Sequence, residues 1–309
     1  MQNLSQMNNI SIIIATKNRL GNLEMLLKSI AESTTHPNEI ILVYSGMDVS
    51  SIAIQFQNYL NIKIIHSLRE NQRHQKFLGI KALSTRSEWM LFLDDDLKFT
   101  QDTLKILIEN YLDNQNYSDA SGFGLKIHGI MYPKFSLLLT LLLKYFGLWS
   151  PKRGAILSSG HAQEYQNAET DCEISWANGI SIWKKSVLWM YEDTNRNTEY
   201  SAYEDVIFSY KVSRQNKIYF ASKAIVLSQK LENPSRLTSK QFISGGYLRL
   251  DFVMNNDELS LIRMMVAQIA RSFHYIFLGD KKSGFLERIY VSIKLYLVLI
   301  GEILLSKLH

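Results

Sequence analysis

The chain has 309 residues, of which 46% are hydrophobic, which is enough to bury a large core and excludes an intrinsically disordered protein. The net charge of +5 is modest for this length, and the basic residues form no single stripe, which argues against a nucleic-acid-binding protein. The one cysteine, Cys172, excludes an intrachain disulfide and predicts a reducing compartment. Residues 1–9 are polar and uncharged and show no signal-peptide pattern, so we expect a cytoplasmic protein.

Strands and helices alternate along the first hundred residues. Ile10–Ala15 is an almost continuous run of β-branched residues, typical of a strand buried on both faces of a parallel sheet. Leu20–Ile30 then carries apolar residues at helical spacing. The alternation continues through strands and helices expected at Glu39–Tyr44, Ile52–Tyr59, Ile62–His66, Gln72–Leu83 and Trp89–Leu93. This order predicts a doubly wound α/β sheet.

Three polar loops follow the predicted strands, at Thr16–Arg19, Tyr44–Asp48 and Asp94–Asp96. Loops at the carboxyl ends of such strands line the ligand crevice, so we expect these three to meet in space. The first loop has no GxGxxG pattern and the chain has no GxxxxGK[ST] pattern, so Rossmann dinucleotide and P-loop sites lose their main support. A nucleotide bound here would be held by the crevice and a metal ion.

The segment Glu88–Asp96 runs an apolar strand into three consecutive carboxylates. Carboxylates side by side repel one another, and at a buried strand end they cost stability unless a cation or water offsets their charge. A divalent metal ion is the natural partner. The alternative is a solvated acidic turn that caps a helix starting at Thr100, and these nine residues alone do not decide between the two.

Four motifs follow one another along the chain. The first two are Ser-Ile-Ile-Ile-Ala-Thr-Lys-Asn-Arg19 and Phe92-Leu-Asp-Asp-Asp96. They resemble those of a family 2 glycosyltransferase of the GT-A fold, and the second has the position of that family's DxD-type motif. Asn178–Leu188 is similar to its acceptor-side glycine segment, which is followed by an aromatic residue, a basic pair and a helix start. Tyr203-Glu-Asp-Val206 resembles its Glu-Asp motif. Each motif is weak alone, but their order across residues 10–230 makes chance a poor explanation.

The resemblance implies an inverting, metal-dependent enzyme that moves a sugar from a nucleoside diphosphate sugar to a hydroxyl group. The leaving diphosphate gains negative charge, and Asp94 and Asp96 supply hard oxygen ligands for Mn²⁺ or Mg²⁺. Asp96 is the surest metal ligand, whereas Asp94 either contacts the donor's ribose or sugar or reaches the metal through water. Asp95 is counted with the donor site but is interpreted as a spacer that points away.

The acceptor hydroxyl has to lose a proton, and a carboxylate can act as the general base. Asp205 is the candidate, because it starts an apolar run that predicts a helix, and a helix N-terminus lowers the pKa of a carboxylate. Glu204 is placed on the acceptor or sugar side. Without the other motifs, both acids would be interpreted as ordinary helix caps.

Six further residues are candidates for binding the donor. The resemblance implies that Thr16, Asn18 and Arg19 contact the nucleobase and ribose, and that Ser45 lies beside the nucleotide. Arg73 and Lys76, on one predicted helix, are candidates for contacts with the donor's phosphates. The alternative for these two residues is a solvated basic helix face.

Aromatic faces stack on sugars, so Trp176 and Trp183 are expected to shape the sugar or acceptor side, together with Asn178 and Gly179. Burial in the core is the alternative for both tryptophans. The sequence alone leaves this choice open.

Two positions depart from the family pattern. After the second strand, where the family usually places an acid, this chain has Tyr44 and Ser45, with Asp48 later, so UDP, GDP and dTDP all remain possible donor nucleotides. The family's late histidine, a further metal ligand, is absent, because Ile225–Gln229 ends in a serine and a glutamine. We therefore expect the metal ion to be held loosely or chiefly by the donor diphosphate.

Three apolar stretches fall outside the alternating pattern. Ile130–Trp149 contains Pro133 and two lysines, a poor composition for a membrane span, and is interpreted as an insertion that covers the acceptor side or touches lipid. Leu259–Leu278 has the pattern of a basic amphipathic helix. Phe285–Leu305 is apolar nearly all round but is short for a span and is interrupted by two charges, so a helix on a membrane or on a partner fits better. An internal helical subdomain and a homodimer interface are the alternatives for the C-terminal helices.

We expect a GT-A domain over residues 1–235, with a donor half at about 1–100, an acceptor half at about 101–235 and an apolar insertion at about 130–150. A helical region over residues 236–309 would lie on the inner face of the cell membrane and meet a lipid-linked glycan acceptor, in bacterial surface polysaccharide synthesis. Two other functions are kept. A sugar-phosphate nucleotidyltransferase is disfavoured because the first turn lacks its glycine-rich arginine loop, and a catalytically silent scaffold would bind a partner glycosyltransferase.

Overall fold

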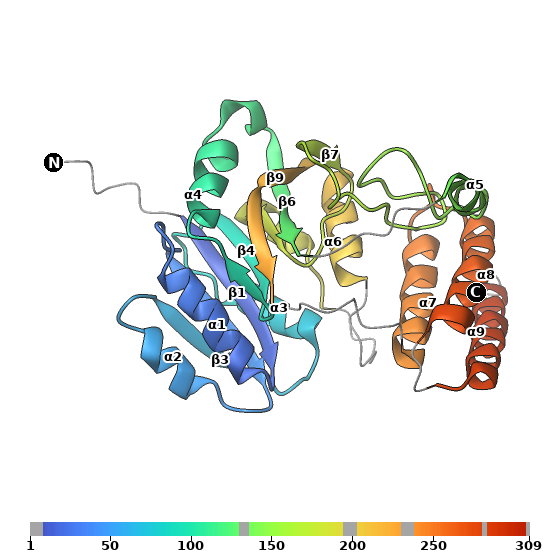
Figure 1. Ribbon diagram of the computed structural model, residues 1–309, viewed down its shortest axis with the longest axis horizontal. Helices are drawn as coiled ribbons and strands as arrows, with labels where there is room; N and C mark the ends of the chain where they lie inside the picture. The colour runs from blue at the N-terminus through green and yellow to red at the C-terminus, as the bar shows by residue number, and fades with distance from the viewer. Residues whose placement is uncertain (1–8, 130–135, 194–202, 230–237, 280–282, 307–309) are drawn as a thin grey trace. The chain divides into compact units, whose positions relative to one another are not determined.

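The computed structural model describes residues 9–129, 136–193, 203–229, 238–279 and 283–306 (Figure 1). Internal contacts divide the chain into two compact units. The first comprises Met1–Ile130, Tyr165–Glu199 and Phe208–Glu232, and the second comprises Met131–Glu164, Tyr200–Ile207 and Asn233–His309. The segment expected to be an apolar insertion is therefore grouped with the C-terminal helices; its residues 130–135 lie outside the described part of the chain. Each unit is described by itself.

The described part of the first unit is built on a nine-stranded mixed sheet. Its strands are β1 (Ile10–Lys17), β2 (Glu39–Ser45), β3 (Ile62–His66), β4 (Trp89–Asp94), β5 (Leu97–Phe99), β6 (Ala120–His128), β7 (Cys172–Ile174), β8 (Ser181–Lys184) and β9 (Lys217–Ser228). The order across the sheet is β3-β2-β1-β4-β8-β6-β9-β5, and β7 pairs with β9. Strands β1 to β4 are parallel to one another, whereas β8 joins β4 and β6 in antiparallel pairs.

The helices agree closely with the expected ranges in the first hundred residues. They are α1 (Leu20–Ala31), α2 (Ser50–Phe56), α3 (Gln72–Lys81), α4 (Thr103–Leu107), α5 (Leu137–Tyr145), α6 (Glu204–Ser213), α7 (Ser239–Met254), α8 (Leu261–Leu278) and α9 (Phe285–Ser306). Short turns of 3₁₀- or π-type helix lie at Ile108–Leu112, Gln115–Tyr117 and Lys185–Met190. The helix expected from Thr100 starts three residues later, and α7 was not predicted.

Both faces of β1 are covered, as the unbroken isoleucine run predicts. Ile12, Ile13 and Ile14 are fully buried. Ile12 and Ile14 belong to the core cluster that includes the buried leucines of α1. Ile13 faces α3, where a Cβ on Gly79 would lie 2.5 Å from its Cγ2 atom, so the glycine permits close helix-on-sheet packing. The doubly wound sheet is therefore confirmed.

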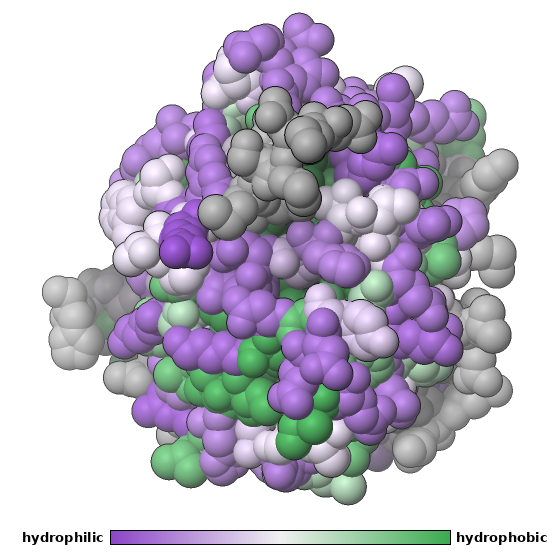
Figure 2. All heavy atoms as spheres, turned by 90° about the vertical axis from the view of Figure 1, so that its left-hand side faces the viewer, coloured by the Kyte–Doolittle hydropathy of each residue, from purple (hydrophilic) through white to green (hydrophobic). Residues whose placement is uncertain are grey.

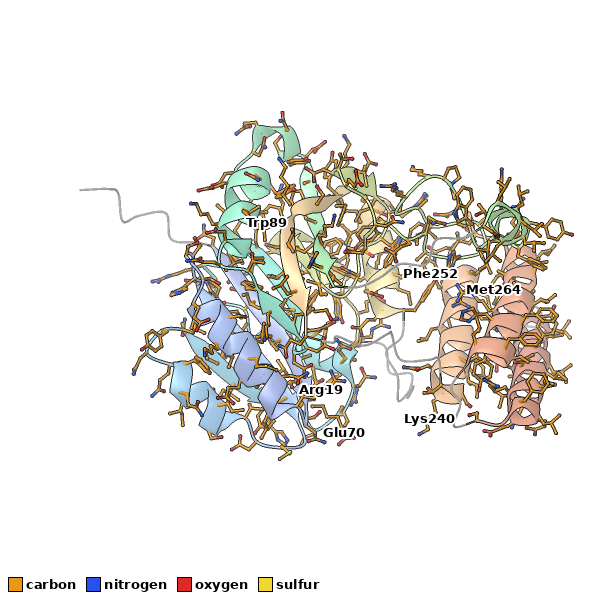
Figure 3. All side chains as sticks on the ribbon, viewed as in Figure 1. Arg19, Glu70, Trp89, Lys240, Phe252 and Met264 are labelled. Atoms are coloured by element: carbon orange, nitrogen blue, oxygen red, sulfur yellow. The ribbon has the colours of Figure 1, made fainter. Side chains whose placement is uncertain are left out.

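The parallel register brings the carboxyl ends of β1 to β4 to one edge of the sheet. Ala15 pairs with Asp94, Lys17 with Ser45, and Tyr44 with His66. Figure 3 shows Arg19 and Glu70 at this edge, and Trp89, the first residue of β4, at the opposite end of the sheet. The three polar loops predicted to meet do lie at this shared edge. The face of the molecule in Figure 2 is mainly hydrophilic, with one hydrophobic strip in its lower half.

The second unit has its own hydrophobic core, made by α7, α8 and α9. Phe242 of α7 stacks on Tyr275 of α8 at a centroid distance of 4.3 Å. Gly246 lets α7 approach α9, because a Cβ there would lie 2.9 Å from Leu295 Cδ2. Thr238 and Gln241 form a capping box at the start of α7. The C-terminal helical region expected from the sequence is therefore confirmed.

Candidate active site

The three consecutive acids have different environments. Asp95 exposes only 3% of its surface, whereas Asp94 and Asp96 are half-buried. Asp94 ends β4, and the other two form the turn into β5. One carboxylate is therefore turned into the protein, and its two neighbours stay partly exposed at the carboxyl edge of the sheet, where Arg19 Nη1 also lies 3.8 Å from Asp96 Oδ2.

Asp95 holds the loop that follows β1. Its Oδ2 accepts a hydrogen bond from Thr16 Oγ1 at 2.6 Å, and its Oδ1 pairs with Arg19 Nη1 at 2.9 Å. Burial raises the pKa of Asp95, and the contacts with Thr16 and Arg19 only partly oppose that shift. The Asp95 side chain points into the protein, as expected, but it is more than a spacer, because its carboxylate orders two of the residues expected to contact the donor.

Asn18 joins the first polar loop to the second. Its backbone has a left-handed φ of 56°, and its Oδ1 accepts a hydrogen bond from the Met47 backbone N–H at 2.9 Å. Gly46 leaves room for this side chain, since a Cβ there would collide with Asn18 Oδ1. The Asn18 side chain thus fixes the shape of the edge, and its expected contact with the nucleobase or ribose stays a prediction.

Gln75 is a positioning residue that the sequence analysis missed. Its buried Nε2 lies 3.0 Å from the Thr16 carbonyl, 3.3 Å from the Val43 carbonyl and 3.3 Å from Ser45 Oγ. It therefore ties α3 to the ends of β1 and β2. The Ser45 hydroxyl faces this network inside the protein, and its proposed place beside the nucleotide stays a prediction.

Lys76, Asp94 and Gly179 surround one small space. A Cβ on Gly179 would lie 3.5 Å from both Lys76 Nζ and Asp94 Oδ2. Gln72 Nε2 donates to Asp94 Oδ1 at 2.8 Å, which fixes the carboxylate. Lys76 exposes 3% of its surface, and its Nζ lies 5.2 Å from the Phe92 ring centroid, so the alternative of a solvated basic face is wrong for this residue. Gly179 has no side chain beyond Cα, so a polar ligand could lie beside this cation and carboxylate.

Arg73, near the start of α3, bonds to the segment at Glu192 and Asp193. Its Nε donates to the Glu192 carbonyl at 2.5 Å, and the neighbouring His74 Nδ1 lies 2.7 Å from Asp193 Oδ2. The structure therefore separates the two basic residues that were expected to act together. Contact between Arg73 and the donor's phosphates stays a prediction.

Both tryptophans are buried, at 1% exposure for Trp183 and 9% for Trp176. Trp183 exposes 1% of its surface and packs on Phe208 at a centroid distance of 4.7 Å, so it belongs to the core and does not stack on a sugar. Trp176 packs edge-on against Tyr165 at 5.0 Å, and the Tyr165 hydroxyl accepts a hydrogen bond from the Asn178 backbone N–H at 2.9 Å. Asn178 Oδ1 is buried without a hydrogen-bond partner among the described residues. This acceptor, next to Gly179, is consistent with a ligand-binding role.

The carboxyl edge of the sheet, where Asp94 and Asp96 lie, is the expected donor edge. It fits a divalent cation that binds together with a diphosphate. Within the described ranges, no three His, Cys, Asp or Glu side chains form a metal-binding group. Mg²⁺ is usually held by one or two carboxylates with substrate phosphates and water, and Asp94 and Asp96 meet that requirement. Gln229 follows β9 in place of the family's histidine. Its backbone N–H donates to the Asp96 carbonyl at 2.9 Å, and its buried Oε1 has no hydrogen-bond partner among the residues that the structure describes.

Tyr44 and Asp48 lie after the second strand, where the chain also departs from the family pattern. The Tyr44 ring lies 5.0 Å from the His66 ring, between the ends of β2 and β3. Asp48 accepts hydrogen bonds from the hydroxyl and the backbone N–H of Ser50, at 2.7 and 3.1 Å. An aromatic surface thus stands where the family usually has an acid.

Glu204 and Asp205 begin α6, as the sequence predicted. Asp205 Oδ1 accepts a hydrogen bond from the Val206 backbone N–H at 2.8 Å, and Glu204 is buried. Both acids are grouped with the second unit, so the structure of the donor edge does not test them. The role of Asp205 as the base and the place of Glu204 on the acceptor side stay predictions.

Comparison with known families gives one match. Residues 11–127, which contain β1 to β4 and the three acids, match the model described as glycosyl transferase family 2. These residues carry a family 2 glycosyltransferase domain. The resemblance and the enzyme class expected from the four motifs are confirmed.

Solved structures confirm the GT-A fold around the family 2 domain. The chain is similar to S. aureus TarS 1-349 in complex with UDP-GlcNAc, with a TM-score of 0.59 and 17% identity over 95% of this chain and 80% of that one. A further TarS structure gives a TM-score of 0.56 and 17% identity over 89% of this chain and 45% of that one. The mannosyltransferase PcManGT from Pyrobaculum calidifontis, in complex with GDP-Man and Mn²⁺, gives 0.54 and 11% over 99% and 82%. No curated protein matches the chain by sequence.

Proposed function

We propose that this chain is an inverting, metal-assisted glycosyltransferase that moves a sugar from a nucleoside diphosphate sugar to a hydroxyl of a glycan or lipid-linked glycan. The observation that carries the proposal is that the three consecutive acids have different environments. Buried Asp95 orders the β1 loop, while Asp94 and Asp96 remain accessible at the edge where that loop ends. The neighbours bound to UDP-GlcNAc and to GDP-Man with Mn²⁺ support a nucleotide sugar and a metal ion.

On the donor side, Asp96 and Asp94 would hold Mn²⁺ or Mg²⁺ against the diphosphate. The metal ion, when bound, offsets the charge that develops on the leaving diphosphate. Lys76 supplies a second positive charge beside Asp94 and Gly179, and its burial strengthens its attraction to an anionic or polar group there. Arg19 is held toward the same edge by Asp95. These residues bind and orient the donor.

On the acceptor side, we propose Asp205 as the general base. It would take the proton of the attacking hydroxyl as that oxygen bonds to the anomeric carbon and the diphosphate leaves from the opposite side. A single displacement of this kind inverts the anomeric configuration. Asp205 lies in the first turn of α6, and a helix N-terminus favours negative charge.

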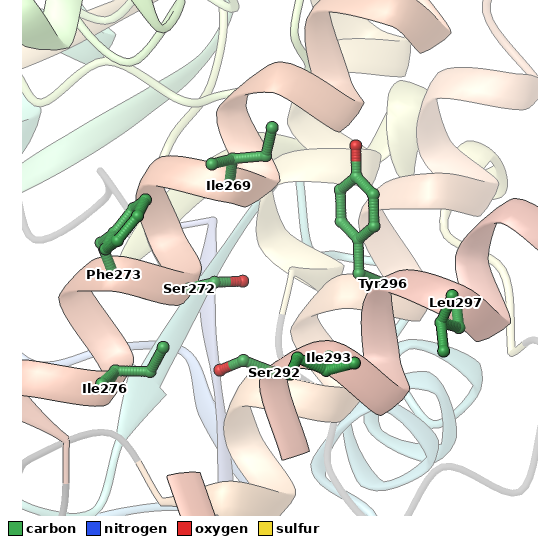
Figure 4. A pocket seen from close by; sticks show the side chains of 8 residues that line it. All are labelled: Ile269, Ser272, Phe273, Ile276, Ser292, Ile293, Tyr296 and Leu297. Carbon is green, nitrogen blue, oxygen red and sulfur yellow. The ribbon is translucent and has the colours of Figure 1, made fainter. Parts of the chain in front are cut away.

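We further propose that the second unit binds the surface of a membrane. In the described ranges, α9 is long and apolar enough to cross a bilayer by length and composition, so the expectation that this segment is too short for a span is not supported. Only 17% of its most apolar window is buried. A cavity of about 290 Å³ between α8 and α9 is almost wholly apolar (Figure 4), and its lining is Ile269, Ser272, Phe273, Ile276, Ser292, Ile293, Tyr296 and Leu297.

Donor hydrolysis tests the reaction class. Purified protein incubated with UDP, GDP or dTDP sugars and Mn²⁺ should slowly release free sugar and the nucleoside diphosphate. Release of pyrophosphate from a nucleoside triphosphate and a sugar 1-phosphate would instead identify a nucleotidyltransferase. Absence of hydrolysis and of transfer with every donor would favour the silent scaffold.

A further inference from the structure

The second unit contains a cluster of buried positive charge that the transfer reaction does not use. Its members are Arg249 on α7, Gln268 and Arg271 on α8, and His161 on the loop before β7. Arg249 and Gln268 are almost fully buried, and the Nε atom of Arg271 is buried as well. All four residues belong to the same unit.

Hydrogen bonds join the four side chains in two pairs. Arg271 Nη2 lies 2.6 Å from His161 Nδ1, and Arg249 Nη1 donates to Gln268 Oε1 at 3.3 Å. An arginine only donates, so Nδ1 of His161 is the acceptor and the ring carries its proton on Nε2. Burial and the two arginines hold the pKa of His161 well below its usual range, so the ring stays neutral.

The loop that carries His161 is held firmly. Gly160 has a left-handed φ of +72°, and a Cβ there would lie 2.7 Å from Val253 Cγ2. The Tyr203 hydroxyl donates to the Gly160 carbonyl, and the Tyr203 ring lies 5.2 Å from the Arg249 guanidinium carbon. Ser260, the N-cap of α8, donates from its backbone N–H to the Ser158 carbonyl at 2.7 Å. The cluster is thus assembled from fixed parts.

No carboxylate among the described residues pairs with either arginine of this cluster. Arg249 Nε, Arg271 Nε and Gln268 Nε2 are buried donors without an acceptor. Burial and the nearby Arg249 lower the pKa of Arg271 to about 9, which still leaves the group charged at neutral pH. Two buried, uncompensated guanidinium groups are costly, and a bound oxyanion would satisfy both their charge and their free N–H groups.

We propose that His161, Arg249, Gln268 and Arg271 form a binding site for a phosphate or diphosphate group. Guanidinium groups and neutral N–H donors match tetrahedral oxyanions in charge and in hydrogen bonding. The phosphate could belong to a free anion or to a lipid headgroup, because both present the same oxygens. The site is independent of the donor edge and does not require the proposed transfer reaction.

Thermal unfolding of the full chain tests the site without any nucleotide sugar. Inorganic phosphate and pyrophosphate should raise the Tm of the wild type in a saturable way, whereas chloride at matched ionic strength should not. Arg271→Met should lose this shift or need roughly tenfold more phosphate, the effect of removing one charged hydrogen-bond donor. Arg263→Met, on the exposed face of the same helix, is the matched control and should respond like the wild type.

Two results would overturn the proposal. The first is an equal response of the wild type to phosphate and to chloride, a comparison that requires no variant. The second is a full phosphate shift in Arg271→Met, which would place the anion elsewhere, including at the donor edge.

Vesicle sedimentation separates the two sources of phosphate. Phosphatidylcholine vesicles with and without phosphatidic acid are compared for wild type, Arg271→Met and Arg263→Met. A lipid headgroup ligand predicts that only Arg271→Met loses the phosphatidic-acid-dependent part of binding. A free anion predicts that all three proteins sediment alike while the soluble phosphate shift is still lost in Arg271→Met.

Discussion

At the scale of single residues, Asp95 shows how a binding edge can be ordered at a cost to stability. Its carboxylate is buried, and its pKa is raised by that burial despite the contacts with Thr16 and Arg19. The folded protein therefore holds the Asp95 proton more tightly than the unfolded chain, so ionisation of this group lowers the free energy of unfolding as pH rises through its pKa. We infer that the ordered β1 loop is maintained for binding.

Asp95→Asn should separate these two effects. The amide removes the buried charge and weakens the hold on Arg19, so we expect an unchanged or higher Tm at pH 8 with roughly tenfold weaker donor binding. Differential scanning fluorimetry and donor titration measure the two quantities. Asp113→Asn, an exposed acid in the same unit, is the control. A large fall in Tm at pH 8 would show that the carboxylate is needed for folding.

Gly179→Ala tests the space between Lys76 and Asp94. The added Cβ would meet Lys76 Nζ and Asp94 Oδ2 at 3.5 Å, an ordinary contact distance, so the fold should tolerate it. The methyl group would occupy space that we assign to the ligand. We expect a Tm close to that of the wild type and a clear loss of transfer or donor hydrolysis. Gly21→Ala, where no atom lies within 4 Å of the new Cβ, should keep full activity.

At the scale of elements, the first four strands could be predicted because each carries its own signal. β3 was predicted with its observed bounds, and β1 and β4 differ only at their carboxyl ends. The strands β6 to β8 were missed. Their segments contain glycine or are only three or four residues long, so they lack the apolar runs that marked the parallel strands.

The candidate site was predicted by residue type more accurately than by role. Asp94 and Asp96 lie at the edge where the strand pattern placed them. Gln75 carries no sequence signal, since a helix-borne glutamine becomes a positioning residue only once β1 and β2 are folded beside it. The core position of Trp183 likewise depends on Phe208, which is far from it in sequence.

The Glu39 carboxylate lies where β2 begins beside β1, and its bonds predict that the free energy of unfolding depends on pH. Burial raises the pKa of the Glu39 carboxylate, but hydrogen bonds from Ser84, Ser11 and Ser87 outweigh burial and lower it. A lowered carboxylate pKa stabilises the fold above the unfolded pKa of about 4.5, and this stability is lost as pH falls through the lower folded value.

Glu39→Gln should therefore unfold more easily than the wild type at pH 7, and the difference should shrink as pH falls below 4.5. Urea unfolding followed by circular dichroism at several pH values measures it. The exposed Glu24→Gln serves as the control. A difference that stays constant with pH would contradict the role of the Glu39 charge.

At the scale of the whole molecule, the exposed apolar helices predict attachment to a membrane surface. Phe273 on α8 and Leu297 on α9 line the apolar cavity and are exposed. Replacing both with serine removes apolar surface without touching the core cluster of the second unit. We expect markedly weaker sedimentation with lipid vesicles and unchanged hydrolysis of a soluble donor. Equal sedimentation of both proteins would contradict this surface, and a change to a smaller oligomer would indicate a homodimer interface.

The central claim is that Asp96 and a divalent cation hold a nucleotide sugar at the carboxyl edge of the sheet. Its most direct test is the Tm of wild type and Asp96→Ala with UDP, GDP and dTDP sugars, each with and without Mn²⁺. We predict that one donor class raises the Tm of the wild type only when Mn²⁺ is present, and that Asp96→Ala shows no such shift. No shift with any donor, or an equal shift in the variant, would contradict the claim.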